Sequence, residues 1–176
     1  MIVDLKTIKD EIELKDISDD KLKRKLRAIE KAIREHTNNK FLDLHFRYWG
    51  EIEDNRIALN TTHLLSKNDN IQLSHCLNNG VYTIDSVDGN KITIMDTNLF
   101  DCGQVMVTKV VYPEDIQEGI INMLKWDFGL RNKIGIKSET ISRHSTTYFD
   151  MDKNNTLKGY PVSLLGFLED YMKARF

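Results

Sequence analysis

The chain has 176 residues, 40% hydrophobic and 30% charged, which is the composition of an ordinary globular protein and excludes a disordered one. Its 25 basic and 27 acidic residues leave a formal net charge of −2, so overall charge alone does not draw it to nucleic acid. No run approaches the roughly 20 apolar residues of a membrane span, and the acidic beginning is unlike a signal peptide. We therefore expect neither membrane insertion nor export by the general secretory route.

Two amphipathic helices are predicted near the beginning of the chain. A short one within residues 2–14 has Leu5, Ile8 and Ile12 on one face. The second, over residues 19–36, has the clearest helical pattern in the protein, and Ser18 is a good N-cap for it. Its apolar stripe steps by four, three and four residues through Leu22, Leu26, Ile29 and Ile33.

The remaining surface of the 19–36 helix is strongly basic. One hypothesis is that this surface faces DNA and contacts its phosphates. The alternative, which we favour, is a solvated face held by internal ion pairs such as Glu30–Arg34 and Lys31–Glu35. The candidate DNA-facing residues are Lys21, Lys23, Arg24, Lys25, Arg27 and Lys31.

Between residues 41 and 112 the hydrophobic period changes from helical to alternating, which predicts strands. The first strand is expected to end at Trp49-Gly50, and the last to run from Gln104 to Tyr112. Tight turns are predicted at Asn79-Gly80 and at Asp88-Gly89-Asn90, because these residues tolerate positive φ angles. Short strands separated by such turns favour an antiparallel meander or a small barrel, inserted between helices.

The last third of the chain contains three elements in succession. Pro113 begins an amphipathic helix that Gly129 loosens and Gly135 ends. Residues 138–149 are polar and strand-prone, which predicts an extended arm without enough large apolar side chains for a core strand. A turn at Gly159-Tyr160-Pro161 then leads to a short apolar helix. Such an ending favours a protein whose last segment is completed by neighbouring subunits.

These residues also carry a resemblance to a known family. The run from Gly135 to Ser145, then Thr147-Tyr148, Gly159-Tyr160-Pro161 and Ala174-Arg175-Phe176, resembles the C-terminal signature of head–tail connectors, the head-completion adaptors of tailed bacteriophages and prophages. The resemblance implies a non-enzymatic structural protein of the virion head–tail junction, assembled in the host cytoplasm. The partners it implies are the portal protein, further copies of the chain in a dodecameric ring, a tail-side completion or stopper protein, and the DNA that traverses the ring.

Together these features predict an α+β fold. Residues 1–40 and 113–135 would form a small helical bundle of connector type, with the β module of residues 41–112 inserted. Residues 136–176 would form a C-terminal extended arm plus a short docking helix. We expect the arm to pair its backbone with an exposed strand of a neighbour or of the portal. The alternative is an ordinary hairpin folded onto the chain's own β module. The predicted partner-binding residues are Ile141, Ser142, Arg143, His144, Ser145, Thr147, Tyr148, Phe149, Tyr160, Pro161, Arg175 and Phe176.

Catalytic motifs are absent from the sequence. The five histidines form no HExxH or HxH pair, and Cys76 and Cys102 lack CxxC spacing, so we expect free thiols. Asp150 and Asp152 begin like a calcium loop, but its glycine and final glutamate are missing. We therefore expect no catalytic residue, metal or cofactor. The alternative function is a small nucleic-acid-binding module that uses the basic face of the 19–36 helix; a small hydrolase has less support.

Overall fold

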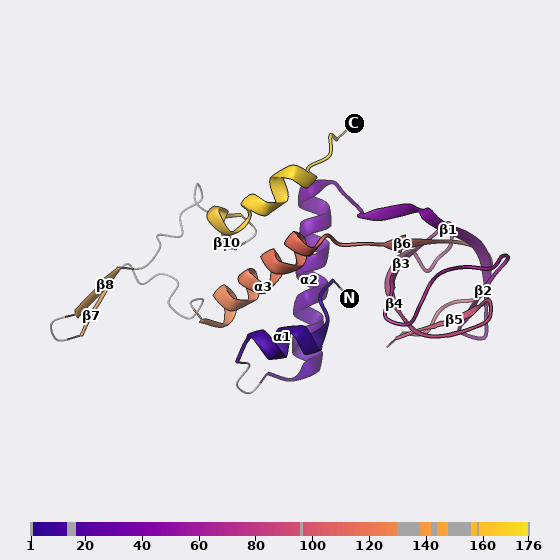
Figure 1. Ribbon diagram of the computed structural model, residues 1–176, viewed down its shortest axis with the longest axis horizontal. Coiled ribbons are helices and arrows are strands. Elements are labelled where there is room, and N and C mark those ends of the chain that lie inside the picture. The colour runs from indigo at the N-terminus through magenta and orange to yellow at the C-terminus, as the bar shows by residue number, and fades with distance from the viewer. Residues whose placement is uncertain are drawn as a thin grey trace. The chain divides into compact units, whose positions relative to one another are not determined.

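The computed structural model describes residues 2–13, 17–95, 97–129, 138–141, 144–147, 156–157 and 159–175. The chain divides into two compact units. Residues 1–2 and 40–112 form one, called here the barrel unit, and residues 3–39 and 113–176 form the other, called the helical unit. Figure 1 shows the strands of the first and the helices of the second.

The described residues of the barrel unit form a closed antiparallel barrel of six strands, in the order β1-β2-β5-β4-β3-β6. Strand β6 pairs with both β1 and β3, and this pairing closes the sheet. The predicted helical bundle of connector type is therefore wrong: the fold is α+β, but the barrel dominates it. The strands are β1 (Leu42–Glu53), β2 (Arg56–Leu59), β3 (Asn70–Ser74), β4 (Gly80–Asp88), β5 (Lys91–Ile94) and β6 (Cys102–Val110).

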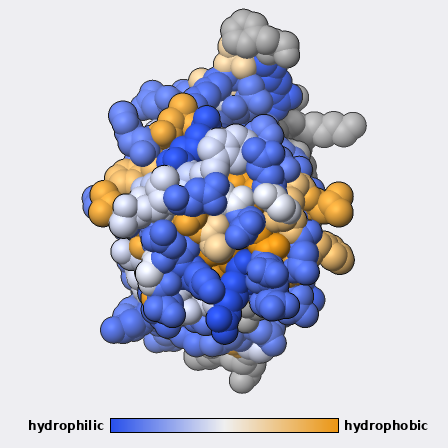
Figure 2. Space-filling model, turned by 90° about the vertical axis from the view of Figure 1, so that its right-hand side faces the viewer, coloured by the Kyte–Doolittle hydropathy of each residue, from blue (hydrophilic) through white to orange (hydrophobic). Residues whose placement is uncertain are grey.

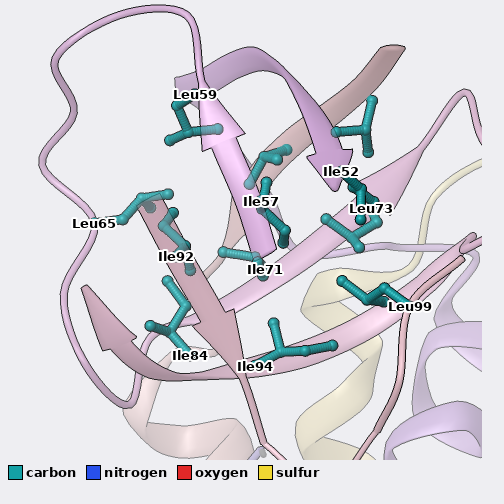
Figure 3. Close-up of a cluster of buried hydrophobic side chains, with 12 residues drawn as sticks. Ile52, Ile57, Leu59, Leu65, Ile71, Leu73, Ile84, Ile92, Ile94 and Leu99 are labelled. Carbon is teal, nitrogen blue, oxygen red and sulfur yellow. The ribbon is translucent and has the colours of Figure 1, made fainter. Parts of the chain in front are cut away.

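Aliphatic side chains fill the inside of the barrel, and every strand contributes at least one of them (Figure 3). Leu65 and Leu99, from the connections β2–β3 and β5–β6, belong to the same cluster. Burying each such side chain contributes about 1.5–3 kcal/mol, so the barrel has a substantial core of its own. The strand residues of this cluster are Ile52, Ile57, Leu59, Ile71, Leu73, Ile84, Ile92, Ile94, Val105 and Val107.

The turns of the barrel agree only in part with the sequence pattern. Strand β1 continues through Trp49-Gly50 and turns at Asp54-Asn55, whose φ angles are 47° and 62°, so the predicted end of the first strand is wrong. The turn at Gly89, with φ of 57° between the paired residues Asp88 and Lys91, is confirmed. Asn79-Gly80 is not a tight turn, because residues 75–79 together connect β3 to β4 and the positive φ, 65°, belongs to His75.

Three helices form the main part of the helical unit: α1 (Leu5–Glu11), α2 (Asp19–Thr37) and α3 (Glu114–Gly129). The predicted N-cap is confirmed, since the Ser18 hydroxyl accepts a hydrogen bond from the Lys21 N–H. The predicted apolar stripe of α2 is buried, and ion pairs join α1 to its neighbours: Lys9–Asp19 at 2.7 Å and Lys125–Glu11 at 2.9 Å. The predicted end of the third helix at Gly135 lies outside the described residues.

At the position of the predicted short docking helix, the C-terminal segment forms short 3₁₀ helices. Strands β9 (Thr156–Leu157) and β10 (Tyr160–Pro161) pair, and η2 (Val162–Leu164) and η3 (Gly166–Tyr171) follow. Beyond them, the Lys173 N–H donates to the Thr37 carbonyl and the Asn38 amide donates to the Ala174 carbonyl. The first bond satisfies the last carbonyl of α2, and the second, from the Asn38 side chain, satisfies a carbonyl of the C-terminal segment, so this segment completes its own unit.

Strands β7 (Ser138–Ile141) and β8 (His144–Thr147) form a separate two-stranded antiparallel sheet. The register pairs Ser138 with Thr147 and Ile141 with His144. The predicted extended arm is therefore a hairpin. Its side chains lie outside the described part of the structure.

Candidate partner-binding surfaces

The β7–β8 hairpin offers backbone edges to a partner. Each strand hydrogen-bonds the other on one side, and within the described residues its second side has no ladder partner. Such an edge presents a row of N–H and C=O groups that a further strand can pair with. Of the predicted partner-binding residues, Ile141, His144, Ser145 and Thr147 lie on these strands, whereas Ser142, Arg143, Tyr148, Phe149 and Phe176 lie outside the described residues.

Three other predicted partner-binding residues make contacts within the helical unit. Tyr160 is only 7% exposed, and its ring lies 5.6 Å from that of Trp126. Pro161 is buried beside it in β10. The Arg175 guanidinium donates to the Glu35 carbonyl at 2.8 Å. These three side chains stabilise the unit, so the surface proposed below does not depend on them.

A buried carboxylate connects α2, α3 and β10. The Asp127 side chain is fully buried, and its Oδ2 lies 2.7 Å from Lys25 Nζ. The Tyr160 hydroxyl donates to the same oxygen. Lys25 Nζ also lies 5.3 Å from the centre of the Phe128 ring, a favourable cation–π position. Lys25, a candidate DNA-facing residue, therefore points into the unit, which corrects that assignment.

Four of the other candidate DNA-facing residues are exposed on α2. Lys21, Arg24, Arg27 and Lys31 fall within one arc of the helix, on the side away from the buried stripe. Lys31 Nζ lies 3.8 Å from a carboxylate oxygen of Glu35, which confirms the predicted internal pair. Lys23 is half-buried. The exposed cations span about ten residues, or roughly 15 Å of helix at 1.5 Å per residue.

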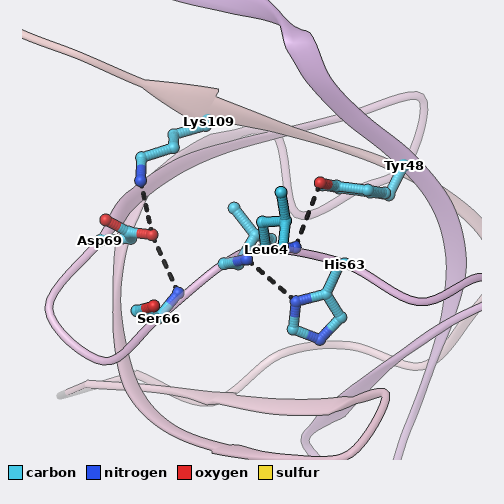
Figure 4. Close-up of polar contacts among 7 residues, drawn as sticks. Tyr48, His63, Leu64, Ser66, Asp69 and Lys109 are labelled. Carbon is cyan, nitrogen blue, oxygen red and sulfur yellow. Dashed lines mark hydrogen bonds and ion pairs between the residues drawn. The ribbon is translucent and has the colours of Figure 1, made fainter.

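The long β2–β3 connection is tied to the barrel by paired polar groups (Figure 4). The Tyr48 hydroxyl accepts from the Leu64 N–H, and His63 Nδ1 accepts from the Leu65 N–H. The Asp69 carboxylate accepts from both the Ser66 N–H and Lys109 Nζ. These groups satisfy the backbone of a connection that covers the barrel core. The arrangement is structural, and it holds Leu65 in place inside the cluster.

Large apolar side chains are exposed on other connections of the barrel. Leu77, between β3 and β4, is 88% exposed, and Phe100, between β5 and β6, is 70% exposed. The Asn78 side chain joins the two connections, since its amide donates to the Phe100 carbonyl and its oxygen accepts from the Phe100 N–H. The face drawn in Figure 2 is mostly hydrophilic with separate hydrophobic patches. The sequence pattern did not indicate that Leu77 and Phe100 are exposed, because exposure of a loop residue depends on tertiary packing.

In the ranges that the structure describes, no group of three or more His, Cys, Asp or Glu side chains is placed to hold a metal ion. None of the helices in the described part of the chain is long and apolar enough to cross a membrane. No model of a known protein family matches the chain, and no curated protein matches it either.

Proposed function

We propose that this chain is a structural protein of the virion head–tail junction, a connector that joins the capsid portal to the tail in a ring around the DNA passage. The C-terminal sequence signature is the starting point. The observation that carries the proposal is the separate β7–β8 sheet, whose outer edges have no ladder partner among the described residues. The partners are the portal protein, further copies of the chain, a tail-side completion or stopper protein, and the DNA that passes through.

A two-stranded sheet has a physical reason to recruit a third strand. Two strands alone are marginally stable in water, and three or more strands, or packing against a helix, are needed for independent stability. A partner strand that pairs with the outer edge of β7 (Ser138–Ile141) or β8 (His144–Thr147) supplies additional ladder hydrogen bonds. Affinity then comes from the main chain, and alternate side chains of the hairpin provide specificity.

Within this proposal, the docking element is the β7–β8 hairpin and not the C-terminal segment. Residues 160–175 pack within the helical unit, with Leu165 and Leu168 buried and Lys173 bonded to Thr37. Removing everything after Gly135 would therefore damage the unit itself. A variant that tests the docking role should therefore change the hairpin alone.

Replacing residues 138–147 with a Gly/Ser linker of the same length should abolish binding to portal particles. The far-UV circular dichroism of the variant should stay close to that of the wild type, because the helical and barrel cores are untouched. Binding is measured by co-sedimentation with portal-containing heads that lack their connector. A matched control replaces exposed Leu77 with Ala. This variant keeps the β7–β8 hairpin intact and should retain binding.

Two results would contradict the proposal in different ways. If the wild-type chain does not bind portal particles, the connector function itself fails. If wild type and the hairpin variant bind equally, the connector function stands and the docking role of β7–β8 fails.

We propose the basic side of α2 as the basis of a second candidate function, nucleic-acid binding. Exposure of Lys21, Arg24, Arg27 and Lys31 on one side of the helix favours it, since these cations can contact successive phosphates. Such binding depends on counterion release, so its affinity falls steeply with salt concentration.

Changing Lys21, Arg24, Arg27 and Lys31 together to Ala should remove DNA binding at low salt and flatten its salt dependence. Fluorescence anisotropy with labelled duplex DNA measures both. The control removes the same charge from exposed positions elsewhere, by changing Arg56, Lys67, Lys91 and Lys173 to Ala. A wild-type chain that shows no binding at low salt eliminates this candidate, and equal losses in both variants would assign binding to net charge alone.

A further inference from the structure

The two cysteines lie at the same part of the barrel unit. Cys76 is in the connection that follows β3, and Cys102 is the first residue of β6. Both side chains are half-buried and pack against the aliphatic cluster inside the barrel. Both are free thiols in this structure. Residues far apart in the sequence thus place two sulfur atoms against one core.

Hydrogen bonds between Asn78 and Phe100 hold together the two chain segments that carry the thiols. Asn78, two residues after Cys76, bonds the Phe100 backbone twice, at 2.7 and 2.9 Å. Phe100 lies two residues before Cys102, whose Sγ donates to the Gln104 carbonyl at 2.9 Å. Asn78 is itself only 5% exposed, and its carbonyl accepts from the Tyr82 hydroxyl. The approach of the two segments is therefore built into the fold.

The pKa of Cys76 reflects this placement. Burial raises the pKa of Cys76 above its ordinary value, a hydrogen bond with Asn78 opposes this rise, and the neighbouring Cys102 thiol adds to it through charge and hydrogen bonding. The raised pKa keeps Cys76 mostly protonated at neutral pH. Its thiolate, which is the reactive form, becomes more abundant as the pH rises.

We propose that Cys76 and Cys102 form a site of covalent modification, an intramolecular disulfide made by exchange with a small-molecule disulfide such as oxidised glutathione. One cysteine thiolate attacks a glutathione sulfur, which forms a mixed disulfide and releases the first glutathione thiolate. The second cysteine loses its proton and attacks the mixed disulfide at the protein sulfur. The second glutathione then leaves, so the protein loses two hydrogen atoms and the oxidant is reduced to two glutathione molecules.

The disulfide would join the connection that exposes Leu77 to the start of β6, directly after the connection that exposes Phe100. It closes the segment from Cys76 to Cys102, which restricts the unfolded chain and raises the melting temperature. It also adds a covalent bond beside the Asn78–Phe100 hydrogen bonds, so the apolar surface on these connections becomes more rigid. The inference concerns the barrel unit and does not depend on the proposed connector function.

The test uses the whole chain incubated with oxidised glutathione and then blocked with N-ethylmaleimide. Intact-mass spectrometry should show a product lighter by two hydrogen atoms, without maleimide or glutathione attached. Peptide mapping should find Cys76 linked to Cys102, and non-reducing electrophoresis should show a monomer. The reaction should proceed faster at alkaline than at neutral pH, and the product should melt at a higher temperature than the reduced chain.

Cys76→Ser and Cys102→Ser are matched controls. Each should stop at a mixed disulfide with one glutathione or form dimers between chains. The wild-type measurement stands even if a variant folds poorly, since it uses the native protein. A wild-type chain that keeps two glutathione groups, that is linked only between molecules, or that accepts two maleimides after prolonged oxidation would overturn the proposal.

Discussion

Replacing Asp127 with Asn should lower the free energy of unfolding by about 2–4 kcal/mol. The Asp127 carboxylate is fully buried and lies 2.7 Å from Lys25 Nζ, while the Tyr160 hydroxyl donates to the same oxygen. The amide of Asn cannot neutralise the Lys25 ammonium, whose side chain is only 26% exposed. The variant therefore leaves a positive charge without its counter-ion in a poorly solvated position. Chemical denaturation at neutral pH, followed by circular dichroism, measures the loss.

Companion variants separate charge from hydrogen bonding at this site. Tyr160→Phe removes one hydrogen bond to Asp127 and should cost only about 1 kcal/mol. Combining Lys25→Met with Asp127→Leu removes both charges, and this pair should be more stable than Asp127→Asn because no buried charge remains unpaired. If Asp127→Asn matched the wild type in stability, or the double variant were the least stable of all, the assigned role of the ion pair would be incorrect.

Replacing Ile71 with Ala should destabilise the protein by about 2–5 kcal/mol. Ile71 is fully buried in the barrel, and its strand pairs with β4 on one side and β6 on the other. Neighbouring strands that are fixed on both sides cannot collapse into the space left by the side chain, so a cavity remains. Urea denaturation and thermal melting both report the loss.

The control for this prediction is Leu77→Ala, which removes an aliphatic side chain that is 88% exposed. Its effect should stay within about 0.5 kcal/mol, because little is buried at that position. If Ile71→Ala and Leu77→Ala lowered the free energy of unfolding by similar amounts, the inside of the barrel would not be the principal core of its unit.

The helices were the most predictable part of this protein. The spacing of Leu22, Leu26, Ile29 and Ile33, with Ser18 as N-cap, indicated α2 correctly. Local chemistry decides such elements, because their hydrogen bonds join residues four apart and their caps lie next to them. The turn at Gly89 was predictable for the same reason. Asn79-Gly80 was not, because His75 supplies the positive φ within a longer connection that Asn78 ties to Phe100.

The candidate surfaces were less predictable than the helices. Lys25 and Arg27 look equivalent in the sequence, yet Lys25 pairs with Asp127 and Arg27 is exposed. Tyr160 and Arg175 belonged to a predicted docking segment, but their partners are Asp127 and Glu35 of the same unit. Which polar side chain is buried depends on helix packing, and the spacing of residues along one helix does not determine it.

By itself, the sequence determined the two amphipathic helices at the beginning of the chain and the strand-rich middle, since each depends on the local periodicity of side chains. The tertiary structure decided that the middle closes into a barrel, because β6 must pair with both β1 and β3 across long stretches of chain. It also decided that the end of α2 is hydrogen-bonded within its own unit, since the Thr37 carbonyl accepts from the Lys173 N–H. Pairing between distant residues leaves no local pattern, and it is this pairing that distinguishes a closed barrel from a meander.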